Sequence, residues 1–301
     1  KKYFDGTPNP TIDDVHTGEN YVISLMNQSD FTTIKDIAEK LLKLAPSDLV
    51  LRRMLFYAQV ETMDFEHAKE SIAYLDDKQY PDSAFLYRDY IYAASFAADG
   101  LDDRAKAIEY YKKAFEKDST KADGYRRMAV LLRSNKQAVE AIPYYKKYLE
   151  LIGDKADAAE RFGLGNIYIA AQNQTTDPAE RQKYIDAGDK IFAEYMEEQP
   201  TKYQGPFYRA QLWILNSSQP EEKPREYYAK ALELIGNNSE YESQKKVALR
   251  YLAFYYLKKN EDATCLKYVD QLLKLAFFVH GSYRCTLLPP SIACSLNHHS
   301  A

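Results

Sequence analysis

The apolar positions of the chain follow a helical period, and the helical stretches repeat. Residues 107–114 read Ala-Ile-Glu-Tyr-Tyr-Lys-Lys-Ala, and residues 141–148 read Ala-Ile-Pro-Tyr-Tyr-Lys-Lys-Tyr. Small or apolar side chains at positions i, i+4 and i+7 share one face of an α-helix. The first position of this face recurs at Ile34, Ala68, Ala107, Ala141, Gly188, Pro224 and Cys265. The steps are 34, 39, 34, 47, 36 and 41 residues, which is the period of a two-helix unit.

A second helix face lies upstream of each of these positions. The spacing between the two faces is twelve residues, except that it is fourteen before Pro224 and twenty-three before Gly188. Five of the seven upstream residues are small, as close contact between helices requires. They are Val22, Phe56, Ser95, Ala129, Gly165, Ala210 and Ala253. The pattern therefore predicts an all-α array of antiparallel helix pairs.

This arrangement resembles the tetratricopeptide-repeat (TPR) family, whose 34-residue unit is a pair of antiparallel helices with small residues where they cross. The matching residues are Leu164, Gly165 and Tyr168 in one first helix, Ala107, Tyr111 and Ala114 in one second helix, and the unit-ending Pro46 and Pro200. The resemblance implies a right-handed superhelical solenoid of about seven helix pairs. The chain looks most like bacterial TPR proteins of unassigned role that are often exported, which favours the periplasm or cell envelope over the cytoplasm.

Three parts of the chain are expected. Residues 1–12 form an extended lead-in, residues 13–275 form the array, and residues 276–301 form an apolar tail. The tail contains one Arg and no Asp, Glu or Lys. It is either a segment of different coding origin, such as a frameshift, or a genuine apolar extension that caps the last helix pair.

Three insertions interrupt the repeat, at residues 76–83, 172–183 and 216–224. In 172–183 we expect a polar turn, Asp177 or Thr176 as the N-cap of the next helix, Pro178 in its first turn, and an overlong second helix. The insertions are either surface variation or loops that protrude at one edge of the array.

Composition and charge exclude several classes of protein. The chain has 46% hydrophobic and 28% charged residues, which is typical of a folded domain. A net charge of −4 argues against binding nucleic acid by bulk electrostatics. No apolar run approaches the roughly 18–20 residues that cross a bilayer.

No catalytic motif is found, so we expect a protein that is not an enzyme and has no cofactor. Gly163-Leu164-Gly165 lies in a helical pattern without a following Gly-Lys pair, so it is interpreted as a packing feature. Cys265 is expected to be a buried core thiol. The tail carries His280, Cys285, Cys294, His298 and His299, but its two Cys residues are nine positions apart. Zinc sites favour closer pairs, so no metal site is predicted.

The resemblance to TPR proteins implies a binding wall made by the first helix of each pair. In the family, positions three before and one after the small crossing residue of that helix contact the ligand. The candidates chosen on that basis are Arg53, Tyr57, Tyr92, Phe96, Arg126, Phe162, Asn166, Phe207, Gln211, Arg250 and Phe254, and Arg133 is added because it lies one turn along from Val130. Aromatic and Arg side chains of this kind anchor interfaces. The alternative is that several of the aromatic residues pack against the next repeat.

The predicted function is a non-enzymatic scaffold that binds a protein or peptide with acidic and apolar side chains in this groove. The family's clamp for a C-terminal carboxylate uses Lys and Asn at the same positions, and only Asn166 matches it, so binding of chaperone tails is not predicted. The alternative is a domain that binds a small molecule or glycan, or that accompanies a catalytic domain. A closed aromatic pocket beside the insertions would favour that alternative, and an open Arg-rich groove would favour peptide binding.

Overall fold

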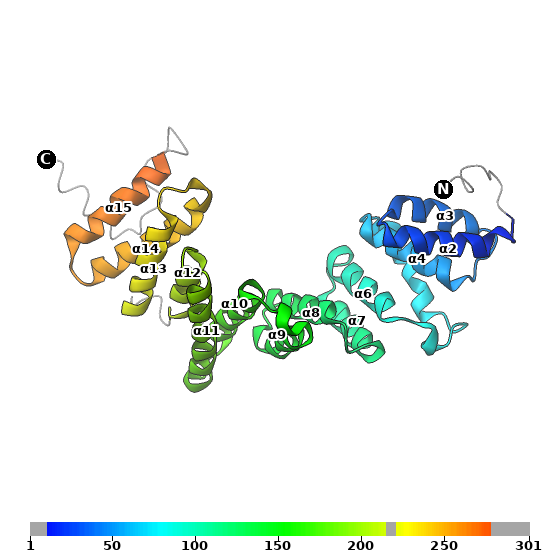
Figure 1. The fold of residues 1–301 in the computed structure, drawn as a ribbon, viewed down its shortest axis with the longest axis horizontal. Coiled ribbons are helices and arrows are strands. Elements are labelled where there is room, and N and C mark those ends of the chain that lie inside the picture. Colours follow the sequence, from blue (N-terminus) through cyan, green and yellow to red (C-terminus); the bar gives the residue numbers. More distant parts are fainter. Residues whose placement is uncertain (1–10, 215–220, 278–301) are drawn as a thin grey trace. The chain divides into compact units, whose positions relative to one another are not determined.

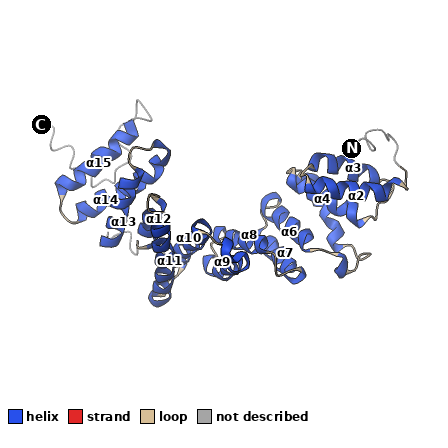
Figure 2. Ribbon diagram, viewed as in Figure 1, coloured by secondary structure: helices blue, strands red, loops and turns tan. Residues whose placement is uncertain are grey.

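The computed structural model describes residues 11–214 and 221–277 (Figure 1). These residues form fourteen α-helices and no strand (Figure 2), so the all-α prediction is confirmed. The chain divides into two compact units, residues 1–156 (unit 1) and 157–301 (unit 2). Most of the predicted lead-in (1–10) and tail (278–301) lies outside the described residues, as do the His and Cys residues of the tail.

Unit 1 is built from eight α-helices in its described part, and most of them pack on their neighbours in sequence. They are α2 (Asp14–Asn27), α3 (Phe31–Leu42), α4 (Leu49–Glu61), α5 (Phe65–Ser71), α6 (Tyr87–Ser95), α7 (Arg104–Lys117), α8 (Ala122–Ser134) and α9 (Ala138–Ile152). Short helical turns join them: η1 (Ile72–Asp76), η2 (Asp82–Ala84), the π-helical η3 (Phe96–Gly100) and η4 (Gly153–Lys155).

Unit 2 follows the same plan. Its helices are α10 (Ala158–Gln174), α11 (Pro178–Glu198), α12 (Gln204–Leu212), α13 (Glu222–Ile235), α14 (Glu242–Lys258) and α15 (Asp262–Phe277), with η5 (Ser239–Tyr241) before α14. Helices α10 and α11 pack together, as do α12 with α13 and α14 with α15.

A left-handed backbone residue recurs in the turns between paired helices. Its φ lies between 50° and 59°, and the following helix begins two residues later. In the first of these turns, the next N–H, from Asp30, bonds to the carbonyl of Leu25 at 3.1 Å and closes the preceding helix. The residues are Ser29, Met63, Asp102, Lys136 and Asn260. The first four are separated by 34, 39 and 34 positions, the steps of the sequence pattern.

The repeated helix faces form the core. All seven positions from Ile34 to Cys265 are buried, and Cys265 is 4% exposed, as predicted. A Cβ added to Gly165 would lie 2.7 Å from the ring of Phe192, so α10 and α11 approach closely only because this residue has no side chain. The interpretation of Gly165 as a packing feature is confirmed.

The predicted insertion at residues 172–183 forms the expected turn. The side chain of Asp177 accepts a hydrogen bond from the backbone N–H of Glu180 at 2.7 Å, and Pro178 occupies the first turn of α11. Helix α11 is 21 residues long. The prediction of a capped, overlong helix is confirmed. Of the insertion at 216–224, residues 216–220 lie outside the described residues.

Within residues 11–214 and 221–277, no helix combines the length and apolar character needed to cross a membrane. The same residues contain no group of three or more His, Cys, Asp or Glu side chains that could hold a metal ion.

Candidate interaction surface

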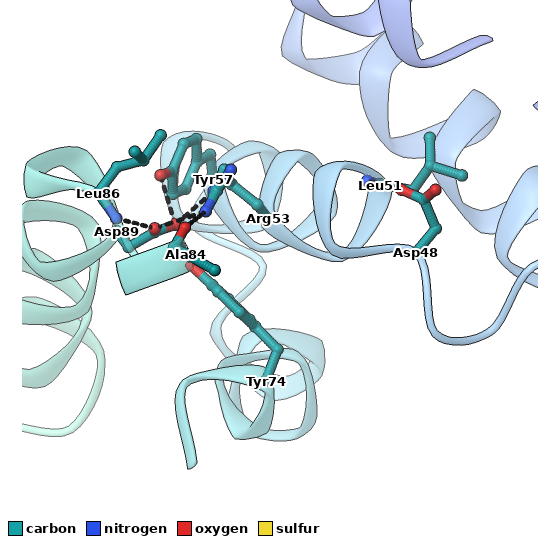
Figure 3. Close-up of polar contacts among 8 residues, drawn as sticks. All are labelled: Asp48, Leu51, Arg53, Tyr57, Tyr74, Ala84, Leu86 and Asp89. Atoms are coloured by element: carbon teal, nitrogen blue, oxygen red, sulfur yellow. Dashed lines mark hydrogen bonds and ion pairs between the residues drawn. The ribbon is translucent and has the colours of Figure 1, made fainter. Parts of the chain in front are cut away.

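A buried carboxylate, Asp89, organises the second and third helix pairs of unit 1 (Figure 3). Its Oδ1 accepts hydrogen bonds from Arg53 Nε at 2.8 Å and from the hydroxyls of Tyr57 and Tyr74 at 2.7 Å. Its Oδ2 accepts from Arg53 Nη2 at 2.9 Å and from the backbone N–H of Leu86 at 2.7 Å. Five donors therefore satisfy one carboxylate, and they come from α4, η1 and the start of α6.

Local sequence places two of these donors on one side of α4. Asp48 caps this helix by accepting the backbone N–H of Leu51 at 2.8 Å (Figure 3). Arg53 and Tyr57 follow four residues apart, so they lie on one face and point at Asp89 together. Arg53 Nη2 also donates to the carbonyl of Ala84 at 2.8 Å, which fixes the end of the insertion that precedes α6.

Burial and the charge of Asp89 together determine the ionisation of Tyr57 and Arg53. Burial and the nearby charge of Asp89 raise the pKa of Tyr57 well above its ordinary value, so its hydroxyl stays a neutral donor. Burial alone would lower the pKa of Arg53, but the hydrogen bonds and charge of Asp89 raise it. Arg53 is thus a buried cation held by a buried anion, with a structural role.

Four of the twelve candidate residues are buried among internal partners. Arg53 and Tyr57 bind Asp89 and are 7% and 1% exposed. The ring of Phe96 meets Phe56 edge-on at 5.9 Å. Phe207 contacts Tyr228 at 5.6 Å and is 3% exposed. These side chains have no surface to offer a partner, so we assign all four to the core.

The other candidates are partly or fully accessible. Tyr92 stacks on Tyr57 with ring centroids 4.2 Å apart and donates a hydrogen bond to Glu61 at 2.7 Å. Phe162 packs in an aromatic cluster of unit 2, 5.0 Å from Tyr208. Three further residues are half-buried and three are exposed: Asn166, Gln211 and Phe254 in the first group, and Arg126, Arg133 and Arg250 in the second.

Unit 1 carries two adjoining cavities along α6 and α8. The first has a volume of about 1150 Å³ and the second about 760 Å³. Tyr92 lines the first and Arg126 the second. Both cavities are lined by Ser95, Asp99, Asp123 and Arg127. We call the surface formed by the two cavities the unit-1 groove.

Most carboxylates of the unit-1 groove are occupied by neighbouring side chains. Asp123 accepts a hydrogen bond from the hydroxyl of Tyr87 at 3.1 Å. Asp118 accepts from Thr120 at 2.6 Å and lies 3.5 Å from the Lys121 ammonium group. These bonds lower the pKa of Asp118, with the Thr120 hydroxyl as the main cause. Most acidic side chains of the groove therefore already have a hydrogen-bond partner within the protein.

Comparison with solved structures identifies the fold. The C-terminal part of a TPR repeat-containing protein from Cytophaga hutchinsonii is similar over 85% of this chain and 95% of its own, with a TM-score of 0.66 and 18% identity. A tetratricopeptide repeat protein from Parabacteroides merdae is similar over 94% and 97%, with a TM-score of 0.50 and 13% identity. The chain has the TPR fold. No protein-family model and no curated protein matches its sequence.

The unit-1 groove of this TPR fold also includes residues that the sequence analysis missed. Arg88 lines the first cavity, and Arg127 lines both. The candidates come mainly from two positions in each first helix, whereas each first helix presents a wider stripe. Arg88 lies four residues before Tyr92, so extending each candidate by one helical turn would have found it. Arg127 is the immediate neighbour of Arg126, and only packing shows that both side chains reach the groove.

The TPR fold of unit 2 contains a second carboxylate centre. Asp189 accepts hydrogen bonds from Arg209 Nε and Nη2 at 2.6 and 2.7 Å and from Trp213 Nε1 at 2.6 Å. Burial opposes ionisation of Asp189, but these donors lower its pKa overall. The ammonium group of Lys223 lies 3.3 Å from the centre of the Trp213 ring. This cluster connects α11, α12 and α13.

Proposed function

We propose that this chain is a protein-interaction scaffold that binds a protein or peptide in the unit-1 groove. The observation that carries the proposal is the pair of adjoining cavities along α6 and α8, because a surface hollowed over two successive first helices suits an extended ligand. The chain is proposed to act by binding and not by catalysis, since its sequence contains no catalytic motif.

Accessible apolar side chains in the groove support this proposal. Leu86 in the first cavity is 51% exposed, and Val130 in the second is 45% exposed. Burying such side chains against a partner is favourable by about 25 cal/mol for each Å² removed from water. Arg126 lies one helical turn from Val130 on the same side of α8 and provides a polar anchor beside it.

The test compares two exposed valines of unit 1. Val130 lines the second cavity, whereas Val139 in α9 lines neither and is 36% exposed. The wild-type chain, Val130→Asp and Val139→Asp would each be immobilised and incubated with an extract of the organism that encodes the protein. We expect a partner to be retained by the wild type and by Val139→Asp and to be lost from Val130→Asp. Equal recovery of every bound protein on all three would contradict the groove as the binding surface.

A further inference from the structure

The cations of the unit-1 groove differ in whether they are already paired. Lys117 is bound to Asp82 at 2.6 Å, and Lys121 lies 3.5 Å from Asp118. In contrast, three guanidinium groups of the groove make no hydrogen bond or ion pair with any described residue. They belong to Arg88, Arg126 and Arg127. The groove therefore contains cations that its own carboxylates do not neutralise by contact.

These guanidinium groups are distributed along the groove. Arg88 lines the first cavity, Arg127 lines both, and Arg126 lines the second. Arg126 lies over the ring of Tyr148, with 5.8 Å between its Cζ and the ring centre, so its planar group rests against an aromatic surface. Arg88 and Arg127 both lie near enough to Tyr92 that their positive charges oppose the rise in its pKa that burial causes.

A free guanidinium group selects its partner by geometry. It presents five N–H donors in a fixed planar fork and binds a carboxylate through two parallel hydrogen bonds. We infer that the unit-1 groove binds an extended acidic segment of a partner protein, whose carboxylates pair with Arg88, Arg126 and Arg127. An apolar side chain of that segment, placed between the carboxylates, contacts Val130. This inference rests on the proposed function.

The acidic groups of the groove limit the kind of anion that fits. Asp99 lines both cavities, is exposed, and makes no hydrogen bond or ion pair with a described residue. Asp123 also lines both cavities, and Glu61 lines the first. A nucleic acid carries one negatively charged phosphate on every nucleotide, and some of these phosphates would be repelled by the carboxylates. A peptide can place its carboxylates at the arginines alone and neutral residues opposite Asp99.

The experiment uses the full chain and a fluorescent peptide of about twelve residues that contains three Glu-Leu pairs separated by Ser. Its counterpart carries Lys in place of Glu, and a third probe is single-stranded oligothymidine. We expect the glutamate peptide to bind and the other two to bind at least tenfold more weakly. Binding of the lysine peptide or of oligothymidine with equal or greater affinity would overturn the inference, as would failure of the glutamate peptide to bind.

Charge-removing variants test the inference by whether they weaken or strengthen binding of the glutamate peptide. Arg127→Gln is expected to weaken binding of the glutamate peptide about tenfold, because a guanidinium–carboxylate pair is lost. Asp99→Asn is expected to strengthen it about threefold by removing a repulsion of the size typical of exposed charges. Lys146→Gln removes a cation from the exposed surface of α9 away from both cavities and should change nothing. A tighter complex with Arg127→Gln, or a weaker one with Asp99→Asn, would contradict the inference.

The two proposals can fail separately. A partner captured through Val130 whose binding is unchanged by Arg127→Gln would keep the scaffold function and overturn the acidic specificity. The thermal unfolding of each variant is to be compared with that of the wild type, so that a loss of binding is counted only for folded protein.

Discussion

Each unit contains an aspartate that binds an arginine through two hydrogen bonds, and the two pairs differ in burial. The side chains of Arg53 and Asp89 in unit 1 are 9% and 0% exposed, whereas those of Arg209 and Asp189 in unit 2 are 20% and 21% exposed. Water can reach the pair of Arg209 and Asp189 and is almost excluded from the pair of Arg53 and Asp89. We therefore expect similar hydrogen bonds to stabilise the two units to different degrees, because the penalty for an unpaired charge depends on the water available to solvate it.

The largest loss of folding stability is expected from Asp89→Ala. It leaves the Arg53 cation and two Tyr hydroxyls buried without their acceptor, which should destabilise unit 1 by about 3–5 kcal/mol. Urea unfolding followed by circular dichroism measures the change. Arg53→Ala, which leaves the carboxylate with the Tyr donors, is the matched comparison. A loss below about 1 kcal/mol for Asp89→Ala would show that water enters the cluster and would remove the contrast between the two pairs.

A smaller effect is expected from Asp189→Ala in unit 2. The donors from Arg209 and Trp213 are partly exposed and can turn to water, so the loss should be about 1–2 kcal/mol. The same urea experiment applies. Because the chain has two compact units, unfolding of unit 2 is best followed by the fluorescence of Trp213, the single Trp of the sequence. A loss as large as that of Asp89→Ala would contradict the dependence on burial.

The smallest loss of stability is expected at Asp64, which accepts from Lys35 at 2.6 Å and lies 2.6 Å from His67 Nδ1. The side chain of Asp64 is 18% exposed, but those of Lys35 and His67 are 28% and 72% exposed, so both partners can turn to water. The variant Asp64→Asn removes the carboxylate charge and should destabilise the fold by about 0.5 kcal/mol at neutral pH. Asp64 lies at the N-cap position of α5, but its side chain makes no capping hydrogen bond there, so the change reports on the ion pair.

The interaction of Asp64 with Lys35 and His67 also makes the stability of the fold depend on pH. The hydrogen bond from Lys35, with a further one from His67, lowers the pKa of Asp64 from 3.8 to about 2. A carboxylate with a lowered pKa stabilises the folded state above its unfolded pKa. The carboxylate's part of the stability difference between wild type and Asp64→Asn should therefore decline as the pH falls from about 5 towards about 2. A second part is lost as the pH rises through the folded pKa of His67, which its hydrogen bond with Asp64 raises above 6.5. A difference that grows on acidification below about pH 5 would have the wrong sign and would contradict the ion pair.

Several features were predictable because they depend on residues close in sequence. The cap at Asp177 and the first-turn Pro178 require only a turn of local structure, and both were found. The absence of a side chain at Gly165 indicated a close helix contact, which Phe192 makes. The candidate binding residues were less predictable. Position in the repeat selected Tyr57 and Phe207 correctly as first-helix residues, but it could not show that their rings are buried.

The order of hydrophobic and polar residues by itself determined that this chain is helical, that its helices pair, and where the turns recur, because these properties follow from the period of one helix and the length of one hairpin. Only the tertiary structure decided which charges are neutralised. Asp89 meets Arg53 from 36 residues away, whereas Arg88, adjacent to Asp89 in sequence, lines the groove. Neighbouring residues on a helix point in different directions, and what each one meets depends on elements that the local sequence does not contain.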